Sequence, residues 1–301
     1  MSITVKIGTR GSQLALWQAK QLQSKLIGID VNSELVIIKT QGDNIQNLSF
    51  DKLEGKGFFT KEIEDSLLSG EVDIAVHSLK DLPTSQPEGL VIAGLSERAD
   101  PRDILLINKK SVDTDRTLDL IAGAKIGTSS LRRKTQILNL VSNIEVKDLR
   151  GNVPTRIQKL RDGDYDGIIL AAAGVERLDL DVSDLVIKKL HPREFVPAPA
   201  QGVIGYQVKE SDHALRKEIL KLHNTTTALR TNLERKVLQL MEGGCQMPLG
   251  VYCEIDNANN YHLFGAYAPS AESPLIRANI SSSTHDGLAE SMVLKLKNNL
   301  N

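Results

Sequence analysis

Residues 124–133 read Ala-Lys-Ile-Gly-Thr-Ser-Ser-Leu-Arg-Arg. Ala124–Gly127 has the character of a short buried strand, three hydroxyl-bearing residues follow it, and a helix is predicted to begin at Leu131. A strand that turns directly into a helix is the repeating unit of α/β proteins. The turn lies at the carboxyl end of the strand, where such proteins bind ligands. Its backbone N–H groups and arginines favour an anion there.

The same alternation extends in both directions from this stretch. Predicted strands cover 4–9, 35–39, 73–77, 90–94, 104–107, 144–149 and 167–170, and predicted helices cover about 12–26, 61–68 and 153–161. Such alternation predicts parallel sheets with helices on both faces. After Ser211 the pattern changes to predicted helices at 212–223 and 226–241, strands at 250–255, 263–267 and 276–281, and a helix near 286–296. Strands in succession predict a small antiparallel α+β domain.

Composition excludes several classes of protein. The 301 residues include 37 Lys and Arg against 38 Asp and Glu, a net charge of −1, which argues against a nucleic-acid or membrane-surface binder. Two cysteines, Cys245 and Cys253, do not make a disulfide scaffold. No signal peptide or long apolar run is visible, so we expect a soluble cytoplasmic protein. The linker-like stretches 96–103 and 192–202 bracket a middle block that reads as an inserted domain.

A basic cluster is the strongest anomaly in the sequence. Eight basic residues against two acidic ones lie between Leu131 and Arg161: Arg132, Arg133, Lys134, Lys147, Arg150, Arg156, Lys159 and Arg161. Arg10 and Ser12 repeat the arrangement after the first predicted strand. Because arginines at strand ends face ligand clefts, we expect Arg10, Arg132, Arg133, Arg150 and Arg156 to bind carboxylates or phosphates. A solvated helix face accounts better for Lys134, Lys159 and Arg161.

Two further residues could carry chemistry. Asp81 follows the strand at 73–77, and a carboxylate among cations could stabilise a developing cation or move a proton; the alternative is a turn or N-cap aspartate. His77 reads as a packed core histidine. Cys245 lies in a Gly-Gly loop that favours a reactive or modified thiol, without metal-ligand spacing, whereas Cys253 reads as a packed small residue. The basic loop 52–59 is a lid or an ordinary surface turn.

Taken together, these segments resemble the porphobilinogen deaminases (hydroxymethylbilane synthases) of tetrapyrrole biosynthesis. The resemblance rests on motifs that occur in family order along nearly the whole chain: Gly8-Thr9-Arg10, Gly55-Lys56-Gly57, Ala75–Pro83, Gly127–Arg133, Leu149–Val153, Ala200-Gln201-Gly202 and Glu242–Cys245. The last fifty or so residues match only in general character.

The resemblance implies two periplasmic-binding-protein-like α/β lobes with mostly parallel sheets and the active cleft between them, followed by a small C-terminal α+β domain. Carried onto this sequence, the first lobe is 1–95 with 200–217, the second is 96–199, and the third domain is 218–301. It also implies a monomer and a transferase of porphyrin and heme biosynthesis. Four porphobilinogen molecules, each losing ammonia, would join head to tail into hydroxymethylbilane, on a dipyrromethane cofactor held to Cys245 by a thioether. No metal, nucleic acid or membrane is implied.

The resemblance also implies residue roles. Asp81 would be the catalytic carboxylate, and the cofactor and substrate would be bound by Arg10, Ser12, Lys80, Thr128, Ser129, Ser130, Arg132, Arg133, Arg150, Gly151, Arg156 and Gln201. The lid would carry Lys52, Lys56 and Phe59. Pro154 and Pro199 stand where relatives have smaller or more flexible residues, which puts loop and hinge mobility in doubt.

The sequence is also compatible with two other hypotheses about function. One is a two-lobed anion receptor without catalysis, and the other is a cysteine-dependent acyl or alkyl transferase with a free Cys245. A Cys245 thiol blocked by a cofactor would indicate a porphobilinogen deaminase, whereas a reactive thiol would indicate the second alternative.

Overall fold

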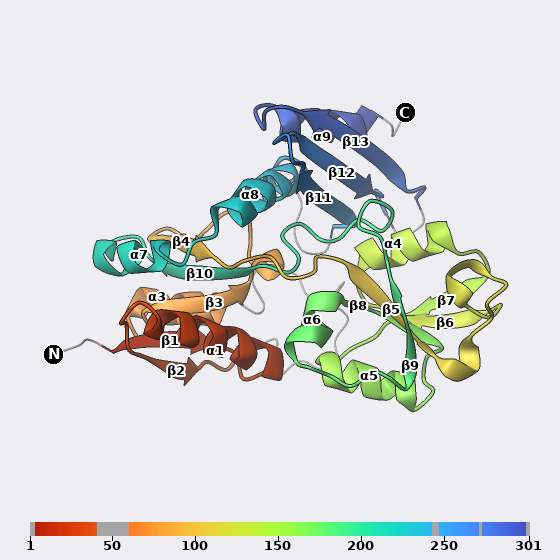
Figure 1. Ribbon diagram of the computed structural model, residues 1–301, viewed down its shortest axis with the longest axis horizontal. Coiled ribbons are helices and arrows are strands. Elements are labelled where there is room, and N and C mark those ends of the chain that lie inside the picture. Colours follow the sequence, from red (N-terminus) through yellow and green to blue (C-terminus); the bar gives the residue numbers. More distant parts are fainter. Residues whose placement is uncertain (1–3, 41–59, 243–246, 271–272, 299–301) are drawn as a thin grey trace. The chain divides into compact units, whose positions relative to one another are not determined.

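The computed structural model describes residues 4–40, 60–242, 247–270 and 273–298, which form two five-stranded sheets and one three-stranded sheet (Figure 1). The chain divides into two compact units, residues 1–99 with 202–229 and residues 100–201 with 230–301. Each unit is described by itself below. The domain limits expected from the sequence remain a prediction.

The first unit contains a five-stranded sheet in the order β2-β1-β3-β10-β4. Its strands are β1 (Val5–Thr9), β2 (Ser33–Ile37), β3 (Ile74–Ser78), β4 (Leu90–Leu95) and β10 (Ile204–Lys209). β1 is parallel to β2 and β3, whereas β10 is antiparallel to both of its neighbours. The helices are α1 (Gln13–Ile27), α3 (Lys61–Ser69) and α7 (His213–Leu220).

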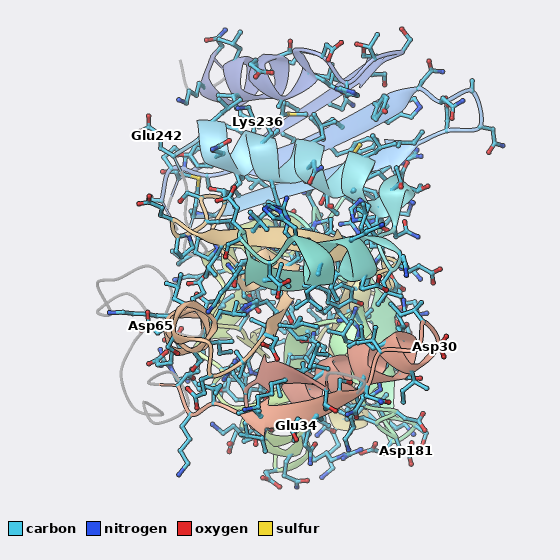
Figure 2. The ribbon with its side chains drawn as sticks, turned by 90° about the vertical axis from the view of Figure 1, so that its left-hand side faces the viewer. Asp30, Glu34, Asp65, Asp181, Lys236 and Glu242 are labelled. Carbon is cyan, nitrogen blue, oxygen red and sulfur yellow. The ribbon has the colours of Figure 1, made fainter. Side chains whose placement is uncertain are left out.

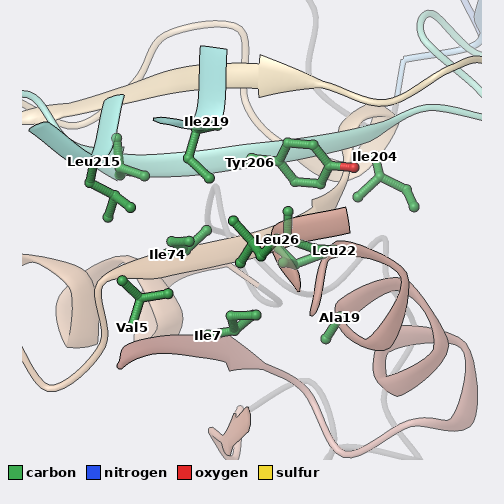
Figure 3. Packing of buried hydrophobic residues seen from close by; sticks show 12 residues of the cluster. Val5, Ile7, Ala19, Leu22, Leu26, Ile74, Ile204, Tyr206, Leu215 and Ile219 are labelled. Carbon is green, nitrogen blue, oxygen red and sulfur yellow. The ribbon is translucent and has the colours of Figure 1, made fainter. Parts of the chain in front are cut away.

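One face of this sheet is covered by the apolar side of α1. Leu22 and Leu26 are fully buried and belong to the same cluster as Ile74 of β3 and Tyr206 of β10 (Figure 3). Spacing of four residues places Leu22 and Leu26 on one side of the helix. The side chain of Ser12 caps the helix by accepting from the Ala15 backbone N–H. The predicted helix start at this serine is therefore confirmed.

The second unit repeats this topology in the order β7-β6-β8-β5-β9. Its strands are β5 (Asp103–Asn108), β6 (Ala124–Gly127), β7 (Ile144–Lys147), β8 (Gly167–Ala171) and β9 (Leu185–Lys189), and its helices include α4 (Leu131–Leu140), α5 (Val153–Arg161) and α6 (Ala172–Arg177). β6 is parallel to β7 and β8, whereas β5 is antiparallel to β8 and β9. The duplicated topology left no repeat visible in the sequence.

The remainder of the second unit is an antiparallel α+β arrangement, as the sequence predicted. β11 (Leu249–Ile255), β12 (Tyr261–Tyr267) and β13 (Ile276–Ser282) form a meander. The helices are α8 (Thr225–Leu240), which begins in the first unit, and α9 (Leu288–Asn298), which packs on β12 and β13 (Figure 1). Cys253 is fully buried and belongs to the same apolar cluster as Leu263 and Val237, so its expected packing role is confirmed.

The prediction of mostly parallel sheets is confirmed. Each five-stranded sheet has one antiparallel member, β10 or β5, and in each case it occupies the fourth place in the strand order. The strand predictions also missed β9 and β10, and the helix predictions missed α6. In β10, Gly205 and the fully buried Gln207 interrupt the apolar run that signals a core strand.

Charged side chains of both signs lie at the surface. Figure 2 shows Asp30, Glu34 and Lys236, all exposed, on the outer surfaces of the ribbon. None of the helices in the described part of the chain is both long and apolar enough to cross a membrane.

The close approach of β11 to the segment before Pro197 predicts a stability effect. A Cβ added at Gly250 would lie 2.4 Å from the Val196 carbonyl oxygen, so we expect Gly250→Ala to lower the free energy of unfolding by about 1–3 kcal/mol. Gly11→Ala is the control, because its Cβ would meet only Ile37 Cγ2, at 3.5 Å. Urea denaturation of both variants checks the prediction, which fails if their midpoints are equal.

Candidate anion-binding and catalytic site

Asp81 lies in a short 3-10 turn, Leu79–Asp81, directly after β3. Leu79 and Leu82 are 1% exposed and anchor the turn in the core, and the Leu79 N–H donates to the Val203 carbonyl at 2.9 Å. The buried leucines leave Lys80 half-buried and Asp81 exposed. The carboxylate is therefore presented at the carboxyl end of a strand, as the sequence predicted.

Arg10 lies at the same edge of this sheet. It follows β1, which runs parallel to β3, so the two strands end on the same side. Arg10 is half-buried, and the Ser12 side chain caps the N-terminus of α1. The first unit thus brings Arg10, Lys80 and Asp81 to one sheet edge, while Ser12 supports the helix start.

Arg132 and Arg133 converge on a buried carboxylate in the second unit. Arg132 Nη1 lies 2.7 Å from Asp103 Oδ2, and Arg133 Nη2 lies 2.8 Å from Oδ1. Asp103 is fully buried at the start of β5, and both arginines are less than 10% exposed. Burial alone would raise the pKa of Asp103, but the two guanidinium charges and their hydrogen bonds hold it far below its usual range.

Two backbone carbonyls and one side-chain amide are further partners of this ion cluster. Arg132 Nη1 also donates to the Val196 carbonyl at 2.9 Å, and Arg133 Nη1 donates to the Ile169 carbonyl at 3.1 Å. Gln201, 1% exposed, donates to Asp103 Oδ1 at 2.9 Å. Two cations and one anion leave a net charge of +1. Within the described residues, hydrogen bonds engage only Nη1 of Arg132, so its Nε and Nη2 remain for an anion.

The side chains of the polar turn at 128–130 form hydrogen bonds with nearby backbone groups. Ser129 Oγ donates to the Leu149 carbonyl at 2.9 Å and accepts from its N–H at 3.0 Å, which ties the turn after β6 to the segment after β7. Thr128 Oγ1 accepts from the Ser130 N–H at 3.2 Å. Ser130 caps α4 through the Arg133 N–H. These hydroxyls fix the start of the helix that carries the two arginines.

The turn at 150–152 has the backbone shape that only glycine allows. Gly151 has φ of 111°, and a Cβ there would lie 2.8 Å from Thr155 Cγ2. Arg156 Nε donates to the Gly151 carbonyl at 2.7 Å, and Arg150 and Arg156 are both half-buried. Pro154 lies in the first turn of α5, where its missing N–H costs no hydrogen bond.

The segment containing Pro199 is braced from α8. Ala200 has φ of 63°, and its N–H donates to Glu234 Oε2 at 2.7 Å, while Glu234 Oε1 accepts from the Cys253 N–H at 2.8 Å. The buried Glu234 carboxylate therefore joins the segment before Gln201 to β11.

Four of the expected site residues, Cys245, Lys52, Lys56 and Phe59, lie outside the described residues. Within residues 4–40, 60–242, 247–270 and 273–298, no cluster of three His, Cys, Asp or Glu side chains could hold a metal ion. Arg161 is paired with Asp184 at the surface, in agreement with its interpretation as part of a solvated face.

The importance of Asp103, Gln207 and Glu234 was not predicted from the sequence. Asp103 was placed in a polar linker, and this interpretation is wrong because the residue begins β5 and is fully buried. No local pattern distinguishes a buried aspartate from a surface one. An excess of strand-end arginines over carboxylates was the available signal that a buried partner existed.

Together the fold and the site define a duplicated α/β protein with a buried arginine pair at the carboxyl end of a strand, extended by an antiparallel α+β part. Residues 5–217 match the family model described as porphobilinogen deaminase, dipyromethane cofactor binding domain, and residues 228–299 match the model of the C-terminal domain of the same family. The chain belongs to the porphobilinogen deaminase family.

Individual relatives agree with this assignment. A porphobilinogen deaminase of Sulfurimonas denitrificans is 45% identical over 253 residues, covering 83% of this chain and 79% of that protein. One from Nostoc is 41% identical over 301 residues, covering 97% and 90%. Among solved structures, a periplasmic substrate-binding protein of an ABC transporter from Coxiella burnetii is 15% identical with a TM-score of 0.45, covering 75% of this chain and 95% of that one. That similarity is too low to inform the site.

The ion cluster predicts a large effect of removing its carboxylate. Asp103→Asn would leave two buried guanidinium groups without a counter-charge, so we expect a loss of about 3–5 kcal/mol in unfolding free energy. The control is Asp184→Asn, which breaks the exposed pair with Arg161 and is expected to cost less than about 1 kcal/mol. Urea denaturation measures both, and equal losses would contradict a special role for Asp103.

His77 predicts a pH dependence of stability. Burial lowers its pKa from 6.5 to about 4, so the unfolded chain takes up the proton first as the pH falls. The stabilisation is complete above pH 6.5 and is lost as the pH falls towards 4, with a total of about 3 kcal/mol. Nearby Glu64, whose pKa burial raises, titrates in the opposite sense.

The comparison of wild type with His77→Gln isolates the histidine, because Glu64 is present in both proteins. Unfolding free energies between pH 7 and pH 4 should fall less steeply in the variant. Parallel curves would contradict the prediction, because they would show that folding does not lower the pKa of His77.

Proposed function

We propose that this chain is a transferase that joins four porphobilinogen molecules head to tail into the linear tetrapyrrole hydroxymethylbilane, with release of one ammonia per molecule and uptake of one water, which supplies the hydroxyl group when the product is released. The family assignment supports this proposal, as do relatives named porphobilinogen deaminase at 41–45% identity. The two alternatives from the sequence, an anion receptor without catalysis and a transferase with a free Cys245, have no comparable support.

The excess positive charge around Asp103 is the observation that carries the proposal. Two guanidinium groups share one carboxylate in a buried place, and Arg132 keeps donors for a further anion. A buried net charge is costly unless a counter-ion completes it. Each pyrrole of porphobilinogen carries an acetate and a propionate, and planar guanidinium groups suit carboxylates well. The donor set therefore fits a polycarboxylate ligand.

The same donor set fits a covalent dipyrromethane cofactor. We propose that Cys245 holds it and that Arg132, Arg150 and Arg156 bind its carboxylates, with Arg133 and Gln201 orienting Arg132 through Asp103. Thr128, Ser129, Ser130 and Gly151 would shape the backbone around those groups. When bound, the dipyrromethane supplies the pyrrole carbon to which the first substrate molecule is joined.

Asp81 would act where positive charge develops. As ammonia leaves porphobilinogen, the pyrrole becomes electron-poor, and a carboxylate that accepts from its N–H stabilises that charge. Lys80 and Arg10, near Asp81 at the same sheet edge, would bind the substrate carboxylates. We further propose that Lys52, Lys56 and Phe59 belong to a lid and that the protein works as a cytoplasmic monomer.

Replacement of the proposed catalytic carboxylate tests the function. We expect Asp81→Asn to lower turnover of porphobilinogen by at least about 100-fold, because an amide cannot balance the developing charge. Intact mass and peptide mapping should still find the dipyrromethane on Cys245 in wild type and variant. The product is followed by the absorbance of the porphyrin formed after oxidation.

The possible outcomes distinguish the proposed function from the two alternatives. Wild-type turnover in Asp81→Asn contradicts the role of Asp81. An unmodified Cys245 that stays unmodified after incubation with porphobilinogen contradicts the enzyme and favours the anion receptor. A free, titratable Cys245 in a protein that transfers other groups favours the second alternative.

A further inference from the structure

The side-chain amide of Gln207 lies at the centre of a buried hydrogen-bond network behind the Asp81 turn. Gln207 is fully buried on β10, between β3 and β4. Its Nε2 lies 2.7 Å from Gln86 Oε1 and 3.0 Å from Glu64 Oε1, and its Oε1 lies 3.1 Å from His77 Nε2. One side chain thus connects α3, β3 and the loop between β3 and β4.

The register of the sheet explains how Gln207 reaches His77. His77 pairs with Gly205 across the antiparallel β3–β10 ladder, so Gln207 is its diagonal neighbour on the same face. On the other side of β10, the pairing with β4 shifts register between Tyr206 and Gln207. Such irregularities re-aim side chains, and here the amide points into the network rather than into the apolar core.

The hydrogen bonds run in one direction. Gln207 Nε2 gives its two hydrogens to Gln86 and Glu64, so its Oε1 must accept and His77 must carry its hydrogen on Nε2. Gln86 Nε2 in turn donates to the Pro83 carbonyl at 2.8 Å. The series of hydrogen bonds therefore starts at His77, passes through Gln207 and Gln86, and ends at the backbone carbonyl of Pro83.

This series of hydrogen bonds restrains the backbone on both sides of the Asp81 turn. His77 precedes Asp81 on β3, and Pro83 follows it by two positions. Between these two points the turn is held by the buried Leu79 and Leu82. An apolar contact fixes the depth of a side chain but restricts direction weakly, whereas a hydrogen bond also fixes orientation. The amide of Gln207 thus supplies the directional restraint on the backbone that carries Asp81.

We propose that Gln207 is a positioning residue for Asp81, an inference that rests on the function proposed above. It touches no reacting atom. It holds the flanking backbone so that the carboxylate meets the pyrrole N–H groups in a productive geometry. Misplacement of a catalytic group by about 1 Å can cost about 100-fold in rate.

Gln207→Leu tests the proposal, because leucine fills a similar volume but makes none of the three hydrogen bonds. In holoenzyme whose cofactor content is verified by mass, we expect kcat per cofactor to fall by about 10-fold with KM changed by less than about 3-fold. The matched control is Glu64→Gln, which keeps an acceptor oxygen for Gln207 Nε2 and should retain wild-type kcat. A wild-type kcat in Gln207→Leu overturns the proposal.

A double-mutant cycle distinguishes positioning from general stability. In an Asp81→Glu background the carboxylate is already displaced, so adding Gln207→Leu should cost less than about 2-fold more. A further loss of about 10-fold in that background shows that Gln207 acts independently of Asp81 and overturns the proposal. Full activity of Asp81→Asn contradicts the role proposed for Asp81, whereas a wild-type protein that forms no tetrapyrrole from porphobilinogen overturns the proposed function, whatever Gln207 does.

A second variant covers the case in which Gln207→Leu does not fold. Gln86→Leu removes the contact to Pro83 from a half-buried position and leaves the pair of Gln207 and His77 intact. It should lower kcat in the wild-type background and have no further effect beside Asp81→Glu. Wild-type kcat in Gln86→Leu contradicts the proposal.

Discussion

A single carboxylate, that of Asp103, fixes the second unit from its interior. It receives hydrogen bonds from Arg132, Arg133 and Gln201, so the start of β5, the first turn of α4 and the segment before β10 must meet at one place. A buried carboxylate and two buried guanidinium groups are tolerated only when every member is satisfied. The geometry of the two arginines is therefore set by the protein itself, and the cluster keeps a net positive charge.

In the first unit, neutral side chains hold the backbone turn that carries Asp81. Around Asp81 the supporting side chains are Gln207, Gln86 and His77, and burial keeps His77 uncharged at neutral pH. Amides orient a backbone without adding a charge near the Asp81 carboxylate. The two units thus support opposite charges by different means. A buried ion pair holds the arginines, and a chain of amides holds the turn that carries the aspartate.

Both supports depend on the strand that breaks the parallel pattern. β5 and β10 occupy the same place in their sheets, and they carry Asp103 and Gln207. An antiparallel strand beside parallel ones brings residues from a distant part of the chain next to the carboxyl ends of the parallel strands, where α/β proteins bind ligands. In the second unit, Glu234 extends this support to β11 by accepting from the Ala200 and Cys253 N–H groups.

The sequence alone predicted the α/β alternation, the α+β part and the strand-end positions of Arg10, Asp81 and Arg132, because these follow from local periodicity and turn chemistry. Its motifs also determined the family. It did not reveal the antiparallel strands, nor the parts played by Asp103 and Gln207. A buried aspartate and a buried glutamine look like surface residues in sequence, since their partners lie at distant positions: Asp103 is paired with Arg132, and Gln207 with His77. Only tertiary structure brings such partners within hydrogen-bond distance, and it alone decided which polar residues are supports and which remain for a ligand.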